Sequence, residues 1–131
     1  MKRIPLNAFA KAIYELLSTY QTTPVYDDIP EGAKAPYISF GLFTSKDAGT
    51  KVNDISDSTL NIDIWSDYSG KKEVNSIAND VIAVINTGAF NIGDDFRFEG
   101  GQVDFFESFP EDDGGYHGVI TFLAKIRNMK E

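Results

Sequence analysis

Hydrophobic and polar residues alternate with a period of two over residues 58–66, and the period changes to about 3.6 a few residues later. The first segment reads in the order Leu60, Asn61, Ile62, Asp63, Ile64 and Trp65. Such alternation predicts a strand with one face on a core. The apolar residues that follow all fall on one stripe of a helix: Val74, Ile77, Ala78, Val81, Ile82 and Ile85. The two segments therefore predict a strand, a short polar turn and a helix that pack as one unit.

The ends of this predicted helix have recognisable signals. Ser69 or Gly70 is expected to cap its start, with Glu73 placed to accept hydrogen bonds from free N–H groups of the first turn. Thr87-Gly88 is expected to end it.

A second amphipathic helix is predicted near the N-terminus. Its stripe consists of Leu6, Phe9, Ala10, Ile13, Leu16, Leu17 and Tyr20. The helix should end near residues 19–21, because Thr22-Thr23-Pro24 prevents its continuation. Residues 25–36 contain further prolines and are interpreted as a connector that is not a central strand.

The other predicted strands occupy residues 37–43, 96–98, 102–109 and 116–127. Gly41 is expected to mark a bulge or a close backbone approach, and Gly100-Gly101 is expected to break the chain between two strands. The strand at 102–109 has apolar residues on both faces, which favours a central or covered position. Residues 44–57 are almost free of large apolar groups and are interpreted as a long polar loop, either a hairpin tip or a partner-binding loop.

These elements predict a single domain over residues 1–131 with a two-layer α+β fold. Two amphipathic helices should pack on one face of a four- to five-stranded mixed, mostly antiparallel sheet. The predicted core contains Ile13, Leu17, Ile62, Ile64, Ile77, Val81, Phe122 and Ile126. With no third layer, Trp65, Phe43, Phe106 and Leu123 should be partly exposed in a monomer, which favours self-association.

Composition narrows the classes of function. The chain has no cysteine, so neither a disulfide nor a thiolate metal site is available. Twelve basic and twenty acidic residues give a net charge of −8, which argues against binding of nucleic acid through its phosphates. The sequence contains no apolar run of about 20 residues, so we expect a soluble protein of a cytoplasmic compartment that does not enter a membrane.

The candidate chemistry is sparse. Glu111-Asp112-Asp113 with Asp94-Asp95 could be read as a divalent-metal site, but acidic residues beside Gly-Gly are more typical of turns. The sequence has no Gly-x-Ser-x-Gly nucleophile elbow that could act with His117, so His117 is interpreted as a surface histidine at the start of a strand. Asp63 and Asp67 are interpreted as solvent-facing rather than as a catalytic pair. We therefore predict no catalytic, metal or cofactor site, and no enzyme activity.

The order of these segments resembles a known family. An N-terminal amphipathic helix, a Pro-rich link into Ala35-Pro36-Tyr37-Ile38, a polar loop and the strand at residues 60–66 precede the second helix. Residues 110–122, Pro-Glu-Asp-Asp-Gly-Gly-Tyr-His-Gly-Val-Ile-Thr-Phe, follow as a turn and a hydrophobic final strand. Over roughly residues 6–127 this order is similar to the tail terminator, or tail completion, proteins of long-tailed bacteriophages and prophages.

The resemblance implies a structural protein that caps the tail tube as a ring of six copies, ends tube growth and joins the head. The implied partners are further copies, the tail-tube protein and a head-completion or connector protein, with DNA only passing through the lumen. The implied location is the bacterial host cytoplasm during assembly and then the virion tail or neck. Another neck, head-closure or minor tail protein is the alternative, and a small metal-dependent enzyme is least favoured. The expected interface residues are Lys46, Asp47, Lys51, Asn53, Asp54, Asp63, Trp65 and Phe106.

Overall fold

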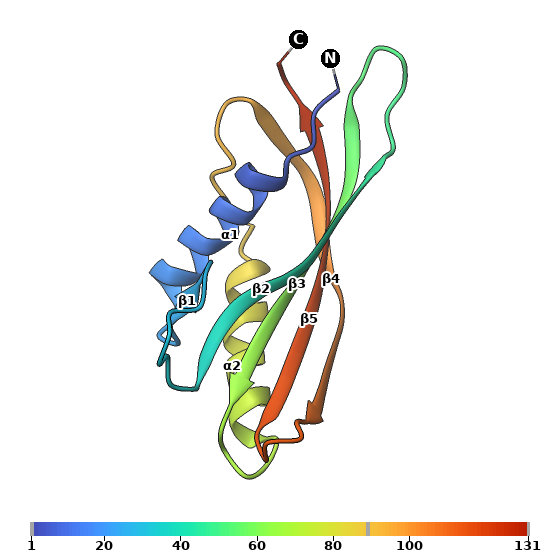
Figure 1. Ribbon diagram of the computed structural model, residues 1–131. Helices are drawn as coiled ribbons and strands as arrows, with labels where there is room; N and C mark the ends of the chain where they lie inside the picture. Colours follow the sequence, from blue (N-terminus) through green and yellow to red (C-terminus); the bar gives the residue numbers. More distant parts are fainter. Residues whose placement is uncertain (1, 89, 131) are drawn as a thin grey trace.

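The computed structural model describes residues 2–88 and 90–130, and it has the predicted two-layer architecture. In chain order the elements are α1 (Leu6–Tyr20), β1 (Val25–Tyr26), β2 (Tyr37–Asp47), β3 (Ile55–Ser66), α2 (Lys72–Ile85), β4 (Phe96–Pro110) and β5 (Tyr116–Asn128). The strands form one sheet in the order β1-β2-β3-β5-β4, in which only the β1–β2 pair is parallel. Both helices lie on the same side of the sheet (Figure 1). No helix or strand of the described residues covers the other face of the sheet.

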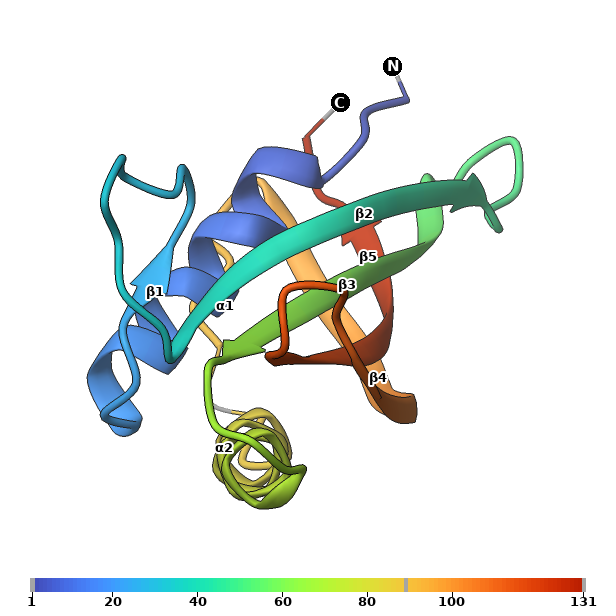
Figure 2. The ribbon, with the colours of Figure 1, turned by 60° about the horizontal axis from the view of Figure 1, so that its bottom comes forward.

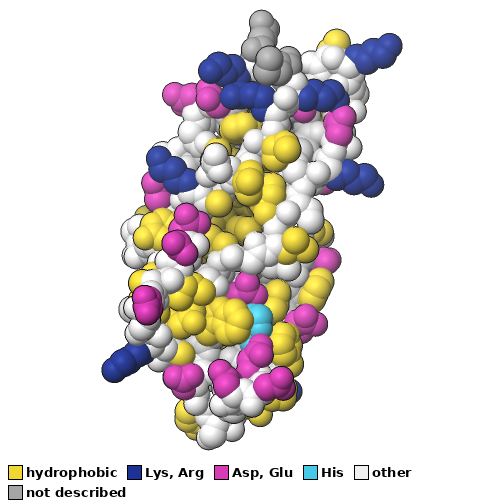
Figure 3. Space-filling view, in the orientation of Figure 1, with side chains coloured by type: hydrophobic (Ala, Val, Ile, Leu, Met, Phe, Trp, Pro, Cys, Tyr) yellow, Lys and Arg dark blue, Asp and Glu magenta, His cyan; other side chains and the backbone are white. Residues whose placement is uncertain are grey.

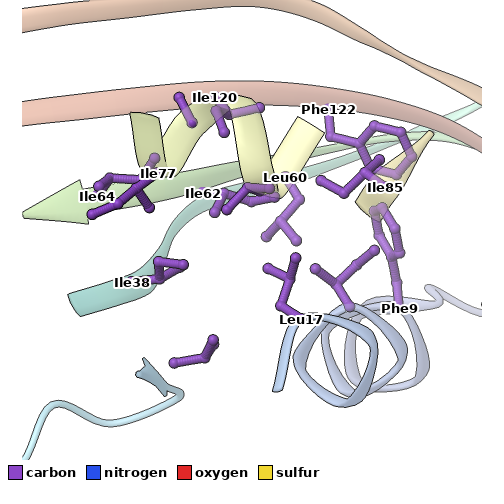
Figure 4. Close-up of a cluster of buried hydrophobic side chains, with 14 of the residues drawn as sticks. Phe9, Leu17, Ile38, Leu60, Ile62, Ile64, Ile77, Ile85, Ile120 and Phe122 are labelled. Atoms are coloured by element: carbon purple, nitrogen blue, oxygen red, sulfur yellow. The ribbon is translucent and has the colours of Figure 1, made fainter. Parts of the chain in front are cut away.

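The core lies between the helices and the inward face of β2, β3 and β5. All eight predicted core residues are buried, including Leu17 on α1 and Ile62 on β3, which have no exposed surface. Side chains from both helices and from the sheet point toward one another in Figure 4. The prediction of one continuous core is therefore confirmed.

The two helices follow their hydrophobic stripes with small differences at their ends. Leu6 and Tyr20, at opposite ends of α1, are exposed although they were predicted on the buried stripe. α2 begins at Lys72 after Lys71, with no side-chain cap, so the predicted capping by Ser69 or Gly70 is wrong. Glu73 instead accepts a hydrogen bond of 2.7 Å from Ser66 Oγ. This bond links the start of α2 to the end of β3.

Half of the predicted polar loop at residues 44–57 is paired strand. β2 extends to Asp47 and β3 begins at Ile55, and Thr44 to Asp47 pair with Thr59 to Ser56. Only residues 48–54 connect the two strands. Hydrogen bonds between the two strands satisfy their backbone N–H and C=O groups here, so the polar side chains do not prevent strand formation. The result is a long β2–β3 hairpin, which extends past the helices in Figures 1 and 2.

Two β-bulges place Phe43 and Phe106 on the face of the sheet opposite to the predicted one. The register shifts between Phe40 and Phe43 and again between Val103 and Phe105. One extra residue reverses which face the following side chains occupy. Phe43 and Phe106 therefore pack, half-buried, against the core and not on the outer face. Trp65 and Leu123 do lie on the outer face and are partly exposed, as predicted.

The sequence prediction is also wrong about β4, which is one continuous strand at the edge of the sheet. It runs through Gly100-Gly101, where a further register shift accommodates Gly100 at a φ of 150°. A side chain at Gly101 would lie 2.7 Å from Leu123 O, which explains why glycine is needed there. Among the described strands β4 pairs only with β5, so it is not central, and its covering at an interface stays a prediction. β1, in contrast, is the short edge strand that the proline-rich connector allowed.

Candidate functional site

The uncovered face of the sheet carries a cluster of aromatic side chains near the C-terminal end of β3. Trp65 on β3 stacks on His117 of the neighbouring β5, with ring centroids 3.9 Å apart and an interplanar angle of 15°. Phe109, which pairs with His117 from β4, approaches the same ring edge-on at 5.0 Å. Trp65 Nε1 donates a hydrogen bond of 3.0 Å to Ser39 Oγ on β2. Side chains of four adjacent strands are thus connected across the open face.

His117 lies between two carboxylates. Its Nε2 is 2.8 Å from Asp63 Oδ1 and its Nδ1 is 2.9 Å from Glu111 Oε1. A neutral imidazole has one N–H, so both contacts can be hydrogen bonds only if a second proton is held by the ring or by a carboxyl group. Burial raises the pKa of Asp63, while the hydrogen bond from His117 opposes that increase.

This arrangement corrects two sequence interpretations. The side chains of His117 and Asp63 are only 13% and 14% exposed, so neither is simply a solvent-facing surface group. Their hydrogen bonds join the final turn to the central strands. No hydroxyl group within residues 2–88 and 90–130 is hydrogen-bonded to His117, so the described cluster contains no activated nucleophile. Chemically, the arrangement can share a proton and fix the turn in place.

The acidic segments do not converge into one site. Glu111 and Asp113 lie beside the His117 cluster, whereas Asp95 lies near Arg3 and Met129 at the other end of the sheet. In the described part of the chain, no group of three or more His, Cys, Asp or Glu side chains is arranged to hold a metal ion. No helix in that part is long and apolar enough to cross a membrane.

A pocket of about 210 Å³ adjoins Trp65. Its exposed lining is mostly polar and includes three carboxylates and one basic side chain, together with a few aromatic rings. The lining residues are Ala33, Lys34, Ala35, Tyr37, Trp65, Ser66, Asp67, Glu111, Asp113, Gly115 and Tyr116. Asp67, predicted to face solvent, is exposed at this pocket. In Figure 3 the single histidine, in cyan, lies among hydrophobic and acidic side chains in the half of the molecule away from the termini.

The opposite end of β3 leads into the hairpin tip, which we define as residues 48–54. The tip is held by backbone hydrogen bonds from Ala48 N to Ile55 O at 2.8 Å and from Thr50 N to Asn53 O at 2.9 Å. Val52 is 88% exposed at the tip, and Lys46 and Lys51 are also exposed. The tip is therefore a formed turn that presents the apolar side chain of Val52 beside the basic Lys51.

Three predicted interface residues in or next to the tip bind the hairpin to the rest of its own chain. Asp47 pairs with Lys2, and the Lys2 hydrogen bond lowers the pKa of Asp47. Asp54 accepts 2.8 Å and 2.9 Å hydrogen bonds from Arg3 N and Asn128 Nδ2. Asn53 accepts one of 2.8 Å from Arg127 Nη1.

The structure thus separates the predicted interface residues into distinct places. Lys46, Asp47, Lys51, Asn53 and Asp54 belong to the hairpin, Asp63 and Trp65 to the open face, and Phe106 to the side packed on the core. Sequence reasoning missed Val52, although it is the only large apolar residue in residues 44–54 and could have been noticed there. It also missed the contact of His117 with Glu111, for which the sequence offers no signal.

Comparison with known protein families identifies the family of this chain. The sequence matches the family described as tail completion protein gp17 over residues 6–127, which is nearly the whole chain. The chain belongs to that family. The resemblance inferred from the order of its segments is therefore confirmed, and the protein is a structural protein of a phage tail.

A solved structure supports the fold of this tail completion protein. A chain from the structure titled "Virion of native gene transfer agent (GTA) particle" matches with a TM-score of 0.83 and 22% sequence identity. The match covers 97% of the present chain and all of the other chain. At this identity, the likeness establishes a shared fold. Comparison with curated proteins gave no match.

Proposed function

We propose that this protein caps the tail tube as a ring, ends tube growth and provides the surface to which the head joins. Membership of the tail completion family over residues 6–127 is the observation that carries the proposal. In this role the protein has no enzymatic activity, and DNA passes through the ring without being bound specifically. Its partners are other copies of itself, in a ring of six, the tail-tube protein and a head-completion or connector protein.

Two features of the fold support a ring-forming structural role. One sheet face lacks a covering layer and carries partly exposed Trp65 and Leu123. The β2–β3 hairpin projects beyond the helices and presents the exposed side chain of Val52 at its tip. Such surfaces suit contacts between copies or with the tube. Assembly takes place in the host cytoplasm, and the assembled ring stays in the virion tail or neck.

Complementation of a phage that lacks its own tail completion gene tests this function. We expect the wild-type protein to restore tails of uniform length that join heads. A variant in which Thr50–Asn53 becomes a Gly-Ser turn should still fold, because the described core contains none of these residues. It should complement poorly, because the proposed contact surface of the hairpin is lost. Asp80→Asn, an exposed change on α2, is the matched control and should complement normally.

Electron microscopy of the uncomplemented phage separates the proposal from its alternative. Tails of irregular length in the absence of the protein would support a role in ending tube growth. Tails of uniform length that fail to join heads would instead indicate a neck or head-closure protein. Complementation by the Thr50–Asn53 variant at the wild-type level would show that the hairpin tip is only a turn.

A further inference from the structure

The two ends of the sheet have opposite charge. We define the hairpin end as residues 2–3, 46–57, 94–99 and 125–130, which strand pairing and ion pairs bring together. This end contains eight of the twelve Lys and Arg residues and six acidic residues, a formal charge of +2. The other described residues contain four basic and thirteen acidic residues, a formal charge of −9. Basic side chains (dark blue) accordingly gather toward the upper end in Figure 3.

The hairpin tip combines this charge with an exposed apolar group. Val52 is 88% exposed, and the adjacent Lys51 is exposed as well. Lys46 and Lys51 make no ion pair within residues 2–88 and 90–130, in contrast to Lys2 and Lys125, which are paired with Asp47 and Asp57. The tip therefore has free positive charge next to a side chain that would gain by leaving water.

The pocket beside Trp65 has the complementary properties. Its lining contains Ala33, Tyr37 and Trp65, the carboxylates of Asp67 and Asp113, and one basic residue, Lys34, so acidic groups outnumber basic ones there. A volume of about 210 Å³ is ample for a branched aliphatic side chain such as that of valine. Neither carboxylate makes an ion pair with a described residue. A basic side chain such as Lys51 would be attracted to these carboxylates, and its neighbour Val52 would then lie against the aromatic rings of Tyr37 and Trp65.

One copy cannot make this contact with itself. The tip precedes Ile55 at the start of β3, and the pocket includes Ser66 at the end of the same strand. A strand of 12 residues separates them by roughly 40 Å. The contact must therefore join different copies, and because it uses two different patches it produces rings or open chains.

We propose that the hairpin tip of each copy, led by Val52 and Lys51, inserts into the Trp65 pocket of the next copy. The inference deepens the proposed ring function by naming its subunit contact, and it relies on that function only for closure of the contacts into a ring. The charge difference between the two ends orients neighbouring copies head to tail.

Engineered cysteines test the contact directly, because the natural chain contains none. With Val52→Cys in the tip and Ala33→Cys in the pocket, mild oxidation should give a ladder of dimers, trimers and larger species. Val52→Cys with Ala83→Cys, at an exposed alanine on α2, is the matched control and should give dimers at most. A ladder no stronger than that of the control, or only a closed dimer, would overturn the proposal.

Reversal of charge provides a second readout in the intact chain. Lys51→Glu and Asp67→Lys should each weaken self-association by about tenfold or more, measured by light scattering at low salt. The double variant should restore it, because each contact then has opposite charges again. Lys11→Glu and Asp80→Lys, on the exposed faces of α1 and α2, are the controls and should leave self-association unchanged. Absence of restoration, or a wild-type protein that stays monomeric, would contradict the proposed contact.

Complementation distinguishes the failure of this inference from failure of the proposed function. If Lys51→Glu and Asp67→Lys both complement the phage fully, the contact is wrong while the ring function stands. If the wild-type protein does not complement, the proposed function fails, whatever the crosslinking shows. Loss of complementation by each single variant, with recovery by the double variant, supports both.

Discussion

Truncation of Leu17 to alanine measures how firmly α1 is fixed to the sheet. Leu17 has no exposed surface and belongs to the central core. The change removes three carbon atoms, worth about 2.4 kcal/mol at roughly 0.8 kcal/mol per buried group. Because the surrounding side chains relax only partly, the remaining cavity should bring the loss to about 3–4 kcal/mol. At about 4 °C per kcal/mol for a chain of this size, the melting temperature should fall by roughly 12–16 °C.

Chemical denaturation followed by circular dichroism, together with thermal melting, measures this loss. Tyr20→Ala, on the same helix at a side chain that is 66% exposed, is the control and should change stability by less than about 0.5 kcal/mol. A loss below about 1 kcal/mol for Leu17→Ala, or equal losses for the two variants, would refute the inference that α1 is held through a close-packed core.

Three further predictions concern the cluster, the packing of β5 and metal ions. Because burial raises the pKa of Asp63, the folded state should bind its proton more tightly than the unfolded state. The stability of the wild type relative to Asp63→Asn should therefore decline as pH rises from 3 to 7 in denaturant titrations, and an increase would show that the ion pair with His117 dominates instead. Gly118→Ala would bring a Cβ atom to 2.7 Å from Val74 Cγ2 and 2.9 Å from Phe106 Cε1, so it should lower stability by about 1–3 kcal/mol in the same assay, and an unchanged stability would contradict this packing. Addition of Ca²⁺ or Mg²⁺ should leave the melting temperature unchanged, and a sharp rise would show a binding site for that ion.

The hydrophobic pattern was sufficient to predict the layers and the core of this fold. Ile62 and Ile64 on β3 and Ile77 and Val81 on α2 follow their respective periods without interruption, and each is buried where predicted. These residues face a large apolar core, so the burial of apolar side chains alone determines their positions. The same pattern predicted that both helices pack on one face of the sheet, which the structure confirms.

Pattern alone failed where the backbone departs from regular pairing. Phe43 follows a bulge after Phe40, and Phe106 follows another after Val103, so both face opposite to a strict alternation. Gly41 signalled the first bulge, since a side chain there would lie 2.3 Å from Asp63 Oδ2. The sequence did not show on which face the chain would resume, because that depends on the register of the neighbouring strand.

The candidate site was predictable only in part for a related reason. Trp65 follows the buried Ile64 in the alternating strand pattern, so its side chain points to the other face of the sheet and is partly exposed. The contact of Asp63 with His117 joins residues 54 positions apart, and it depends on the order in which β3 and β5 pair. A strand order is a property of the whole fold, so a local pattern cannot supply it. The hairpin itself was one of the predicted alternatives, but the extension of β2 to Asp47 and of β3 from Ile55 was missed, because these parts of the strands are stabilised by backbone pairing more than by apolar side chains.

The edge strand β4 has a consequence for unwanted aggregation. A free edge of 15 residues could accept strands from other chains and seed a fibril. Its register shifts near Gly100 and Phe105 interrupt the regular row of donors and acceptors that an added strand would need. Asp104 and Glu107 add negative charges that would repel their counterparts in an adjacent copy. The edge of the sheet is thereby protected against growth by strand addition.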